Sequence, residues 1–279
     1  VRLNAMAHRQ DAPGRDVEEF ERWGVAPAVT IGLSGQTQFT AMWFHQEDTN
    51  TPQYGVPFFN GRPLPGVDPS NYYGYANVDT QEQTVDMLTG ILDHEFSSSL
   101  RIRGLVRYQQ VDYLTIANAP QGTWCLANGM KPVAYSQSTT ATNITGFAPC
   151  TASDPAPGFY QPSGPRGRYR DADTEMLHGQ VDLTWEGEFA GVRHTVVVGA
   201  ATFEEDYELL TGEVQRTATG ATVALPPMSI ADPDNTYRGP LNLIPTSIQY
   251  GERSNQAIYA FDNIELNDQW SINAGVRWE

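Results

Sequence analysis

Polar and apolar residues alternate along most of this chain, and the clearest run covers residues 177–189. Its odd positions, from Leu177 to Phe189, are apolar or glycine, and its even positions, from His178 to Glu188, are polar. Successive side chains of a β-strand point to opposite faces, so the run predicts a strand with one apolar and one wet face. Strands of soluble sheets average about five or six residues, whereas a tilted membrane-spanning strand needs about nine to eleven. The length of the run therefore favours a membrane-spanning strand.

Eight further segments bring the prediction to about nine strands. Alternation is clear in four of them: 1–8, 22–33, 100–110 and 270–279. It is less clean in four others, which are assigned from β-branched residues and flanking turns: 37–47, 84–96, 192–206 and 255–266. Pro27 has no N–H to donate to a ladder, so we expect a local break or bulge there.

The links between these segments alternate between short and long. The short ones are 34–36, 97–99, 190–191 and 267–269, and the long polar ones are roughly 11–20, 48–82, 115–174 and 207–254. Short turns on one edge and long loops on the other are typical of outer-membrane barrels, whose turns are periplasmic. Aromatic residues near both strand ends would form the two membrane girdles: Trp23, Trp43, Phe44, Tyr108 and Tyr113 towards the loops, and Phe96, Phe189 and Trp270 towards the turns. The alternative is a secreted β-sandwich with core aromatics at its rim.

Composition narrows the functional classes. The 279 residues carry a formal charge of −16, which argues against a nucleic-acid binder. The sequence has no run of 18 apolar residues, so a transmembrane helix is not predicted. It also has no nucleophile elbow, zinc-protease motif or phosphate-binding loop, the signatures by which many enzymes are recognised. The Asp171–Asp173 and Asp232–Asn235 segments do not complete a calcium loop, and the five histidines fall on separate segments. We therefore expect no catalytic residue, metal site or cofactor.

The two cysteines, Cys125 and Cys150, fall within one long loop. They predict a loop-closing disulfide formed in an oxidising compartment, with two free thiols or half a metal site as the alternatives. Both chain ends fall within alternating sequence, so we expect residues 1–279 to be one partial barrel domain. An open wall would leave unpaired edges in hydrocarbon, so we expect missing sequence or other chains to complete it.

Three stretches carry a family resemblance. Residues 257–278 resemble a strand–turn–strand hairpin of TonB-dependent outer-membrane receptors, and residues 54–65 with 71–75 resemble a loop of ferric-siderophore receptors, especially the catecholate type. Residues 93–97 resemble the turn that follows the next strand in that family. The resemblance implies that this chain corresponds to roughly strands three to eleven of a 22-stranded barrel in the bacterial outer membrane. The N-terminal plug that fills such a barrel is absent from these residues. The resemblance also implies energy-coupled import of a ferric siderophore, with the TonB complex and outer-membrane lipid or lipopolysaccharide as partners.

Aromatic side chains suit the planar rings of such a ferric chelate, and arginine suits its anionic oxygens. The ligand candidates are Tyr54, Phe58, Phe59, Arg62, Tyr72, Tyr73, Tyr75 and Trp124. The alternative is that these aromatics pack the long loops onto themselves. The candidates for contact with the plug, all on the lumen face, are Arg101, Arg103, Arg107, Asp182, Glu186 and Glu188. A cobalamin-like or glycan ligand, a passive porin, and a secreted β-sandwich that acts in binding or adhesion remain alternative functions.

Overall fold

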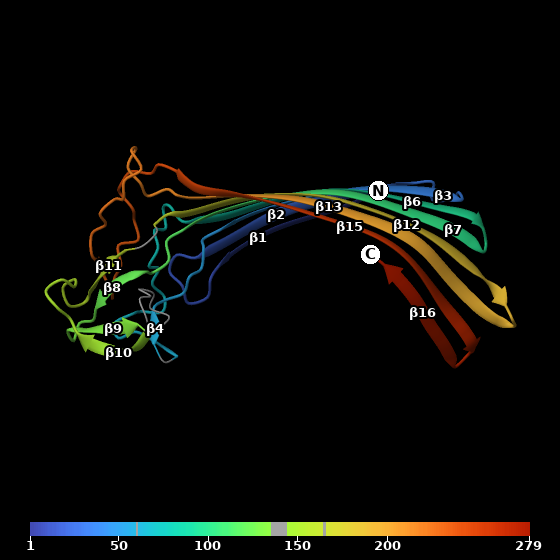
Figure 1. Cartoon of the computed structure of the whole chain (residues 1–279). Coiled ribbons are helices and arrows are strands. Elements are labelled where there is room, and N and C mark those ends of the chain that lie inside the picture. Colours follow the sequence, from blue (N-terminus) through green and yellow to red (C-terminus); the bar gives the residue numbers. More distant parts are fainter. Residues whose placement is uncertain (60, 135–143, 164–165) are drawn as a thin grey trace.

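A single antiparallel sheet forms the body of the protein in the computed structural model, which describes residues 1–59, 61–134, 144–163 and 166–279 (Figure 1). Its nine strands follow one another in chain order. They are β1 (Arg2–Asp11), β2 (Glu19–Ile31), β3 (Thr37–Asn50), β6 (Thr80–Ser97), β7 (Leu100–Ala117), β12 (Arg168–Phe189), β13 (Val192–Glu213), β15 (Ile244–Asn267) and β16 (Trp270–Trp278). The predicted all-β wall of about nine strands is confirmed. The described sheet is open, with β1 and β16 at its two edges.

The strands are longer than alternation alone predicts. β12 and β13 each span 22 residues and β15 spans 24, so they extend well beyond the apolar band towards the long loops. The predicted loop 115–174 shortens to residues 118–167, because the ladders of β7 and β12 continue to the pair Ala117–Arg168. Polar residues at those ends still complete the ladder, since strand pairing depends on the backbone.

The register places the apolar positions of neighbouring strands on one face. Val181 of β12 lies opposite Gly104 of β7 and Ala200 of β13, and Leu183 lies opposite Ile102 and Val198. The sheet is arched, and the long connections fold towards its concave side (Figure 1). Tyr54 belongs to one of these connections, and its hydroxyl is close enough to Tyr113 and Arg170 on the polar face for their electrostatic interaction to affect its pKa. The polar face is therefore concave and the apolar face convex.

Exposure agrees with this orientation, because side chains converge on the inside of an arch and spread on its outside. Thr89 and Ala257 on the concave face are buried, whereas Leu183 is 41% and Val276 68% exposed on the convex face. No second sheet covers Leu183 or Val276 in the described part of the chain, which is contrary to a β-sandwich. The described residues also contain no helix long and apolar enough to cross a membrane.

Pro27 breaks one ladder locally. β2 pairs with β3 up to Val25 and resumes at Ala28 in the same register, while Pro27 itself lies opposite Leu3 of β1. The expected break is confirmed, and no residue is inserted. A missing N–H removes a ladder bond without displacing the strand.

The short turns all lie at one end of the sheet and the long connections at the other (Figure 1). Ala190 and Gly191 both have positive φ, which gives a two-residue turn that suits the twist of β12 and β13. The long connections carry small elements: β4 (Phe58–Phe59), β5 (Arg62–Pro63), β8 (Gly122–Cys125), β9 (Met130–Ala134), β10 (Ile144–Pro149), β11 (Phe159–Pro162) and β14 (Met228–Ser229). β8, β11 and β14 form a three-stranded sheet that joins two of the connections.

Candidate functional site

The long connections pack together around a core of their own, and we refer to described residues of 51–79, 118–163 and 214–243 as the loop body. The rings of Trp124 and Tyr160 are stacked with centroids 4.1 Å apart, and Tyr73 meets both edge-on. The buried cluster consists of Leu64, Val67, Tyr73, Tyr75, Trp124, Leu126, Tyr160, Met228, Ile230 and Tyr237. Residues from all three connections contribute, so none of them folds independently of the others.

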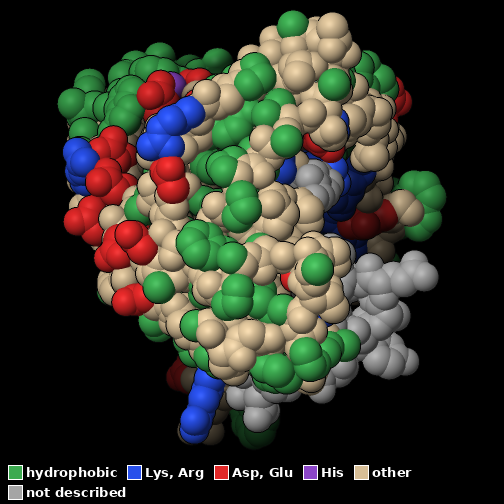
Figure 2. All heavy atoms as spheres, turned by 90° about the vertical axis from the view of Figure 1, so that its left-hand side faces the viewer, with side chains coloured by type: hydrophobic (Ala, Val, Ile, Leu, Met, Phe, Trp, Pro, Cys, Tyr) green, Lys and Arg blue, Asp and Glu red, His purple; other side chains and the backbone are tan. Residues whose placement is uncertain are grey.

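Three of the eight predicted ligand residues belong to this core, and Tyr72 is buried outside it against Asp79. Tyr72, Tyr73, Tyr75 and Trp124 are all buried, so a ligand cannot reach their rings in this arrangement. Figure 2 looks onto the loop end and shows apolar side chains scattered among polar ones. For these four residues the structure shows the self-packing that the sequence left as the alternative.

A buried carboxylate ties two of the connections together where they join the sheet, just before β6 and just after β7. Asp79 accepts hydrogen bonds from the Tyr72 hydroxyl at 2.7 Å, the Asn118 amide at 2.6 Å and the Tyr75 backbone N–H at 3.1 Å. Burial raises the pKa of Asp79, although these hydrogen bonds oppose the shift. Burial and the charge of Asp79 also raise the pKa of Tyr72 above its ordinary value. Asp79 is therefore a structural acceptor at the root of the loop body.

Bonds across the connections complete this arrangement. The Tyr73 hydroxyl donates to the Ile230 carbonyl at 2.6 Å. Asn77 and Tyr237 exchange two hydrogen bonds of 2.8 and 2.9 Å through the Asn77 amide and the Tyr237 backbone. These partners are about 160 residues apart in sequence. The loop body is consequently one packed unit.

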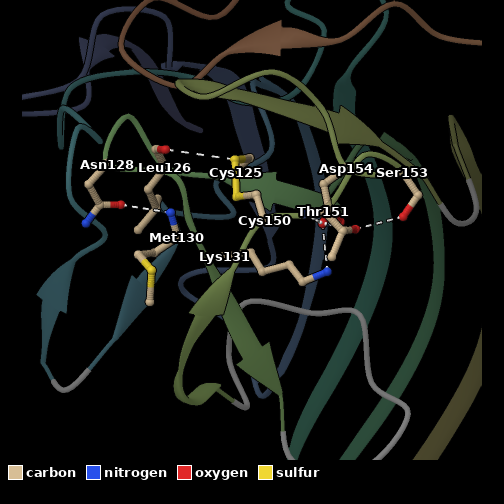
Figure 3. The surroundings of a disulfide bond; sticks show 9 residues. All are labelled: Cys125, Leu126, Asn128, Met130, Lys131, Cys150, Thr151, Ser153 and Asp154. Atoms are coloured by element: carbon tan, nitrogen blue, oxygen red, sulfur yellow. Dashed lines mark hydrogen bonds and ion pairs between the residues drawn. A yellow bond between two sulfur atoms is a disulfide. The ribbon is translucent and has the colours of Figure 1, made fainter.

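The predicted disulfide is present. Cys125 and Cys150 are bonded, and Cys125 is fully buried beside the core (Figure 3). Just beyond Cys150, Asp154 accepts hydrogen bonds from the Lys131 ammonium at 2.8 Å and the Thr151 hydroxyl at 2.7 Å. The Lys131 ammonium and the Thr151 bonds lower the pKa of Asp154 to about 2.

The other predicted ligand residues lie nearer solvent. Tyr54 is 52% and Phe58 46% exposed, and Arg62 is exposed. Phe59 pairs through its backbone with Arg62 in the β4–β5 hairpin, and its side chain lies outside what the structure describes. Burial of its hydroxyl end raises the pKa of Tyr54, with Asp79, Tyr113 and Arg170 as its charged or titratable neighbours.

Two arginines that the sequence analysis missed lie on the concave face at the loop end. Arg168 and Arg170 occupy alternate positions of β12, opposite Ala117 and Thr115 of β7, and Tyr113 is the diagonal neighbour of Arg170. Tyr113 shares this lumen-side parity, so its expected place in a membrane girdle was wrong. Both arginines are exposed, and neither forms an ion pair with any residue that the structure describes. Period-2 alternation extended back from residue 177 could have identified them.

The predicted plug-contact residues lie further down the same concave face. Arg103 is opposite Asp182 in the register and forms an ion pair of 3.8 Å with Asp93. Asp182 also accepts a hydrogen bond from the Gln180 amide at 2.8 Å and one from the Tyr259 hydroxyl. The charges at this level alternate in sign.

The remaining members are distributed along the face. Arg101 and Glu186 line one small cleft beside the Ser98–Ser99 turn, and Glu188 lines another beside the neighbouring turns. Arg107 lies higher and donates to the Thr89 hydroxyl at 3.1 Å. Five of the six therefore lie in the turn-end part of the face, spread over separate places, and Arg107 lies higher than these five.

A comparison with known families decides what kind of wall this is. The family model described as "TonB dependent receptor-like, beta-barrel" matches residues 22–279. The chain belongs to this family. It is part of the wall of an outer-membrane β-barrel, with its convex face towards lipid and its concave face towards the lumen.

Individual relatives agree with the family. The catecholate siderophore receptor Fiu of Escherichia coli K12 is 27% identical over 296 residues, which cover 99% of this chain and 34% of Fiu. The probable TonB-dependent receptor BfrD of Bordetella pertussis Tohama I is 25% identical over 287 residues, covering 100% of this chain and 35% of BfrD. The chain thus spans about a third of the length of these relatives.

Solved structures share the fold. The closed form of Fiu from E. coli K12 superposes with a TM-score of 0.70 at 23% identity, over 99% of this chain and 36% of Fiu. The siderophore receptor PiuA of Acinetobacter baumannii gives 0.68 at 19% identity, over 99% of this chain and 37% of PiuA. In this TonB-dependent receptor wall, the arginines at the loop end therefore face the mouth of the lumen.

Proposed function

We propose that this chain is the part of a TonB-dependent receptor that admits an anionic ferric siderophore of the catecholate class from the cell exterior. Family membership and the similarity to receptors named for catecholate siderophores support the class of ligand. Energy coupling through the TonB complex belongs to the same proposal. The chemistry is recognition and passage, so no covalent step is required of these residues.

The observation that carries the proposal is the pair Arg168 and Arg170 at the mouth. The chain has a charge of −16, which repels an anionic complex at long range unless cations are presented locally. Arg168 and Arg170 present two such cations on the lumen face, free of carboxylate partners among the described residues. Guanidinium groups match the chelate's anionic oxygens.

Aromatic residues near the pair suit the planar rings of the same ligand. Tyr113 lies on the lumen face beside Arg170, and Tyr54 approaches both from the loop body. We assign Tyr54, Tyr113, Arg168 and Arg170 as ligand contacts. We assign the exposed Phe58 and Arg62 of the β4–β5 hairpin to the outer part of the same surface, and this assignment leaves the four buried aromatics as its scaffold.

The lower lumen wall has a different character, and we assign it to plug contact. Its charges alternate in sign around Arg103, Asp182 and Asp93, which favours a protein surface with complementary charges over a small anion. Reversing Arg101 and Arg103 to glutamate should loosen the plug in the complete receptor, increasingly as salt is lowered. Unchanged plug retention would count against this role.

The ligand assignment is tested with the complete receptor carrying Arg170→Glu. The dissociation constant for an iron(III) tris-catecholate, measured by quenching of protein fluorescence, should rise at least about tenfold, which corresponds to about 1.4 kcal/mol. Arg238→Glu is the matched control, because Arg238 is an exposed loop arginine paired with Asp234 and lies outside the proposed surface. Equal affinities for the two variants would refute the assignment of the mouth.

A further inference from the structure

One carboxylate of the wall adjoins both arginines at the mouth. Glu213, the last residue of β13, lies directly opposite Arg168 of β12 and is the diagonal neighbour of Arg170. Residues that lie opposite each other on one face of an antiparallel pair have Cβ atoms about 4.5–5.5 Å apart, and diagonal neighbours are about 7–8 Å apart. Glu213 is therefore within reach of both guanidinium groups, and an ion pair with either of them would withdraw a cation from the ligand.

The other ladder neighbours of Arg168 on the lumen face carry no negative charge. Ala117 of β7 lies opposite it, and Thr115 of β7 and Thr211 of β13 are diagonal to it. All residues of β7, β12 and β13 are described, so Glu213 is the one acid beside Arg168 in these three strands. The availability of Arg168 to a ligand consequently depends on where the Glu213 carboxylate finds its partner.

The Glu213 carboxylate pairs with a different arginine. Arg216, three residues further along the chain, donates to it, while Arg168 stays exposed and forms no ion pair with a described residue. The side chains of Glu213 and Arg216 are only 11% and 21% exposed. A carboxylate that is this far from water needs a charged partner, and Arg216 supplies one.

Backbone hydrogen bonds hold Arg216 against the wall. Its N–H donates to the Val214 carbonyl at 2.9 Å, and Asn242 braces the same turn by donating from its N–H to Val214 at 2.7 Å and from its amide to the Arg216 carbonyl at 2.9 Å. The Val214 N–H in turn donates to the Gly167 carbonyl at 2.9 Å. A Cβ at Gly167 would lie 2.5 Å from the Val214 side chain, so glycine permits this close approach. Main-chain bonds thus place Arg216 beside the strand end.

We propose that Arg216 is a positioning residue for ligand capture, which neutralises Glu213 so that Arg168 and Arg170 stay available to the anionic chelate. The inference rests on the proposed function, in which these two arginines contact the ligand. Without Arg216, the Glu213 carboxylate pairs with Arg168 and leaves the mouth with one positive charge fewer. Both changes oppose the binding of an anion.

The availability of Arg168 can be measured without any siderophore. Phenylglyoxal modifies accessible guanidinium groups, and mass spectrometry of peptides from the complete receptor gives the rate at each arginine. Because Glu213 then occupies it, Arg168 should react at least about fivefold more slowly in Arg216→Gln than in the unmodified receptor. Arg166 is buried two residues away and should stay unreactive in both. Reaction of Arg166 in the variant would show instead that Arg216 holds the loop body together, which is contrary to the proposal.

The affinity for an iron(III) tris-catecholate tests the consequence for binding. Arg216→Gln should raise the dissociation constant at least about fivefold, and adding Glu213→Gln should restore it, because no carboxylate then needs a partner. Arg216→Lys keeps the positive charge and should bind nearly as the unmodified receptor does. Arg238→Gln is the matched control, since it removes an arginine from another loop ion pair, with Asp234, and should leave the affinity unchanged.

Failure of this inference differs from failure of the proposed function. If Arg168→Gln does not weaken binding, the assignment of the mouth is wrong, while slower modification of Arg168 in Arg216→Gln still supports the role of Arg216. If Arg168→Gln weakens binding but Arg216→Gln leaves the reactivity of Arg168 unchanged, the mouth stands and the inference is overturned. A loss of affinity in Arg216→Gln that persists when Glu213→Gln is added would overturn it as well.

Discussion

Replacing Val181 by arginine tests which face of the wall meets hydrocarbon. Val181 lies on the convex face, four residues from Leu177 and four from Trp185, and Leu177 is opposite the girdle residue Tyr108. Four residues correspond to about 13 Å along a strand, which a tilt of about 40° reduces to about 10 Å of depth. Val181 is therefore close to the middle of the apolar band.

The expected cost follows from that depth. An arginine on the lipid face near the bilayer midplane destabilises a barrel by about 2–4 kcal/mol. That range corresponds to a decrease of about 30- to 900-fold in the folded-to-unfolded ratio. Gln180→Arg is the matched control, because Gln180 is adjacent in sequence and points into the wet lumen; it should change stability by no more than about 0.5 kcal/mol.

The measurement is the denaturant dependence of folding of the complete receptor in phospholipid vesicles, followed by the mobility difference between folded and unfolded barrel on unheated gels. Val181→Arg should move the midpoint to lower denaturant, while Gln180→Arg leaves it nearly unchanged. Equal shifts for the two variants, or a larger shift for Gln180→Arg, would refute the assignment of the faces.

The loop body gives three further predictions. Replacing Cys125 and Cys150 by serine removes a link across 25 residues. The loss of chain-entropy restraint should lower the stability of the loop body by about 3.5 kcal/mol. Proteolysis of residues 126–149 should therefore accelerate while the barrel stays folded. Leu126→Ala should destabilise the loop body by about 2–5 kcal/mol, because Leu126 is fully buried in its core; hydrogen exchange of the Tyr73 and Tyr160 amides reports it, and unchanged exchange would contradict the packing. The pKa of Asp154 is lowered in the folded state, so the hydrogen bonds that its carboxylate accepts are complete above the ordinary pKa near 4 and are lost as pH falls towards 2. Hydrogen exchange at the Thr151 amide should increase over that interval. The increase should be absent in Asp154→Asn, which has no carboxylate to titrate.

Local patterns made much of the wall predictable. Period-2 alternation is a property of each strand by itself, so the faces of residues 177–189 could be assigned without knowing any partner strand. The disulfide was equally accessible, because both cysteines fall in one connection. Strand ends were less predictable, since the ladder continues past Leu177 to Arg168 through polar residues that the apolar pattern does not mark.

The loop aromatics could not be assigned from sequence for a physical reason. A tyrosine in a polar loop can face a ligand or a core, and the difference depends on partners that are distant in the chain. Tyr73 is buried because its hydroxyl reaches the Ile230 carbonyl and its ring meets Trp124 and Tyr160. Arg168 and Arg170 were missed because the polar sequence before Leu177 has no apolar face and is typical of a loop, although their alternate spacing places both on the lumen face once β12 is extended.

The most direct test of this account is the solvent accessibility of spin labels placed one at a time along β12, from Leu177 to Trp185, in the complete receptor in lipid bilayers. Both cysteines of this chain are already joined in the disulfide, so introduced cysteines in it can be labelled singly. Labels at odd positions should collide mainly with dissolved oxygen, and labels at even positions mainly with a water-soluble nickel chelate. Collision rates that do not alternate between odd and even positions would contradict a wall with lipid on one side and a wet lumen on the other.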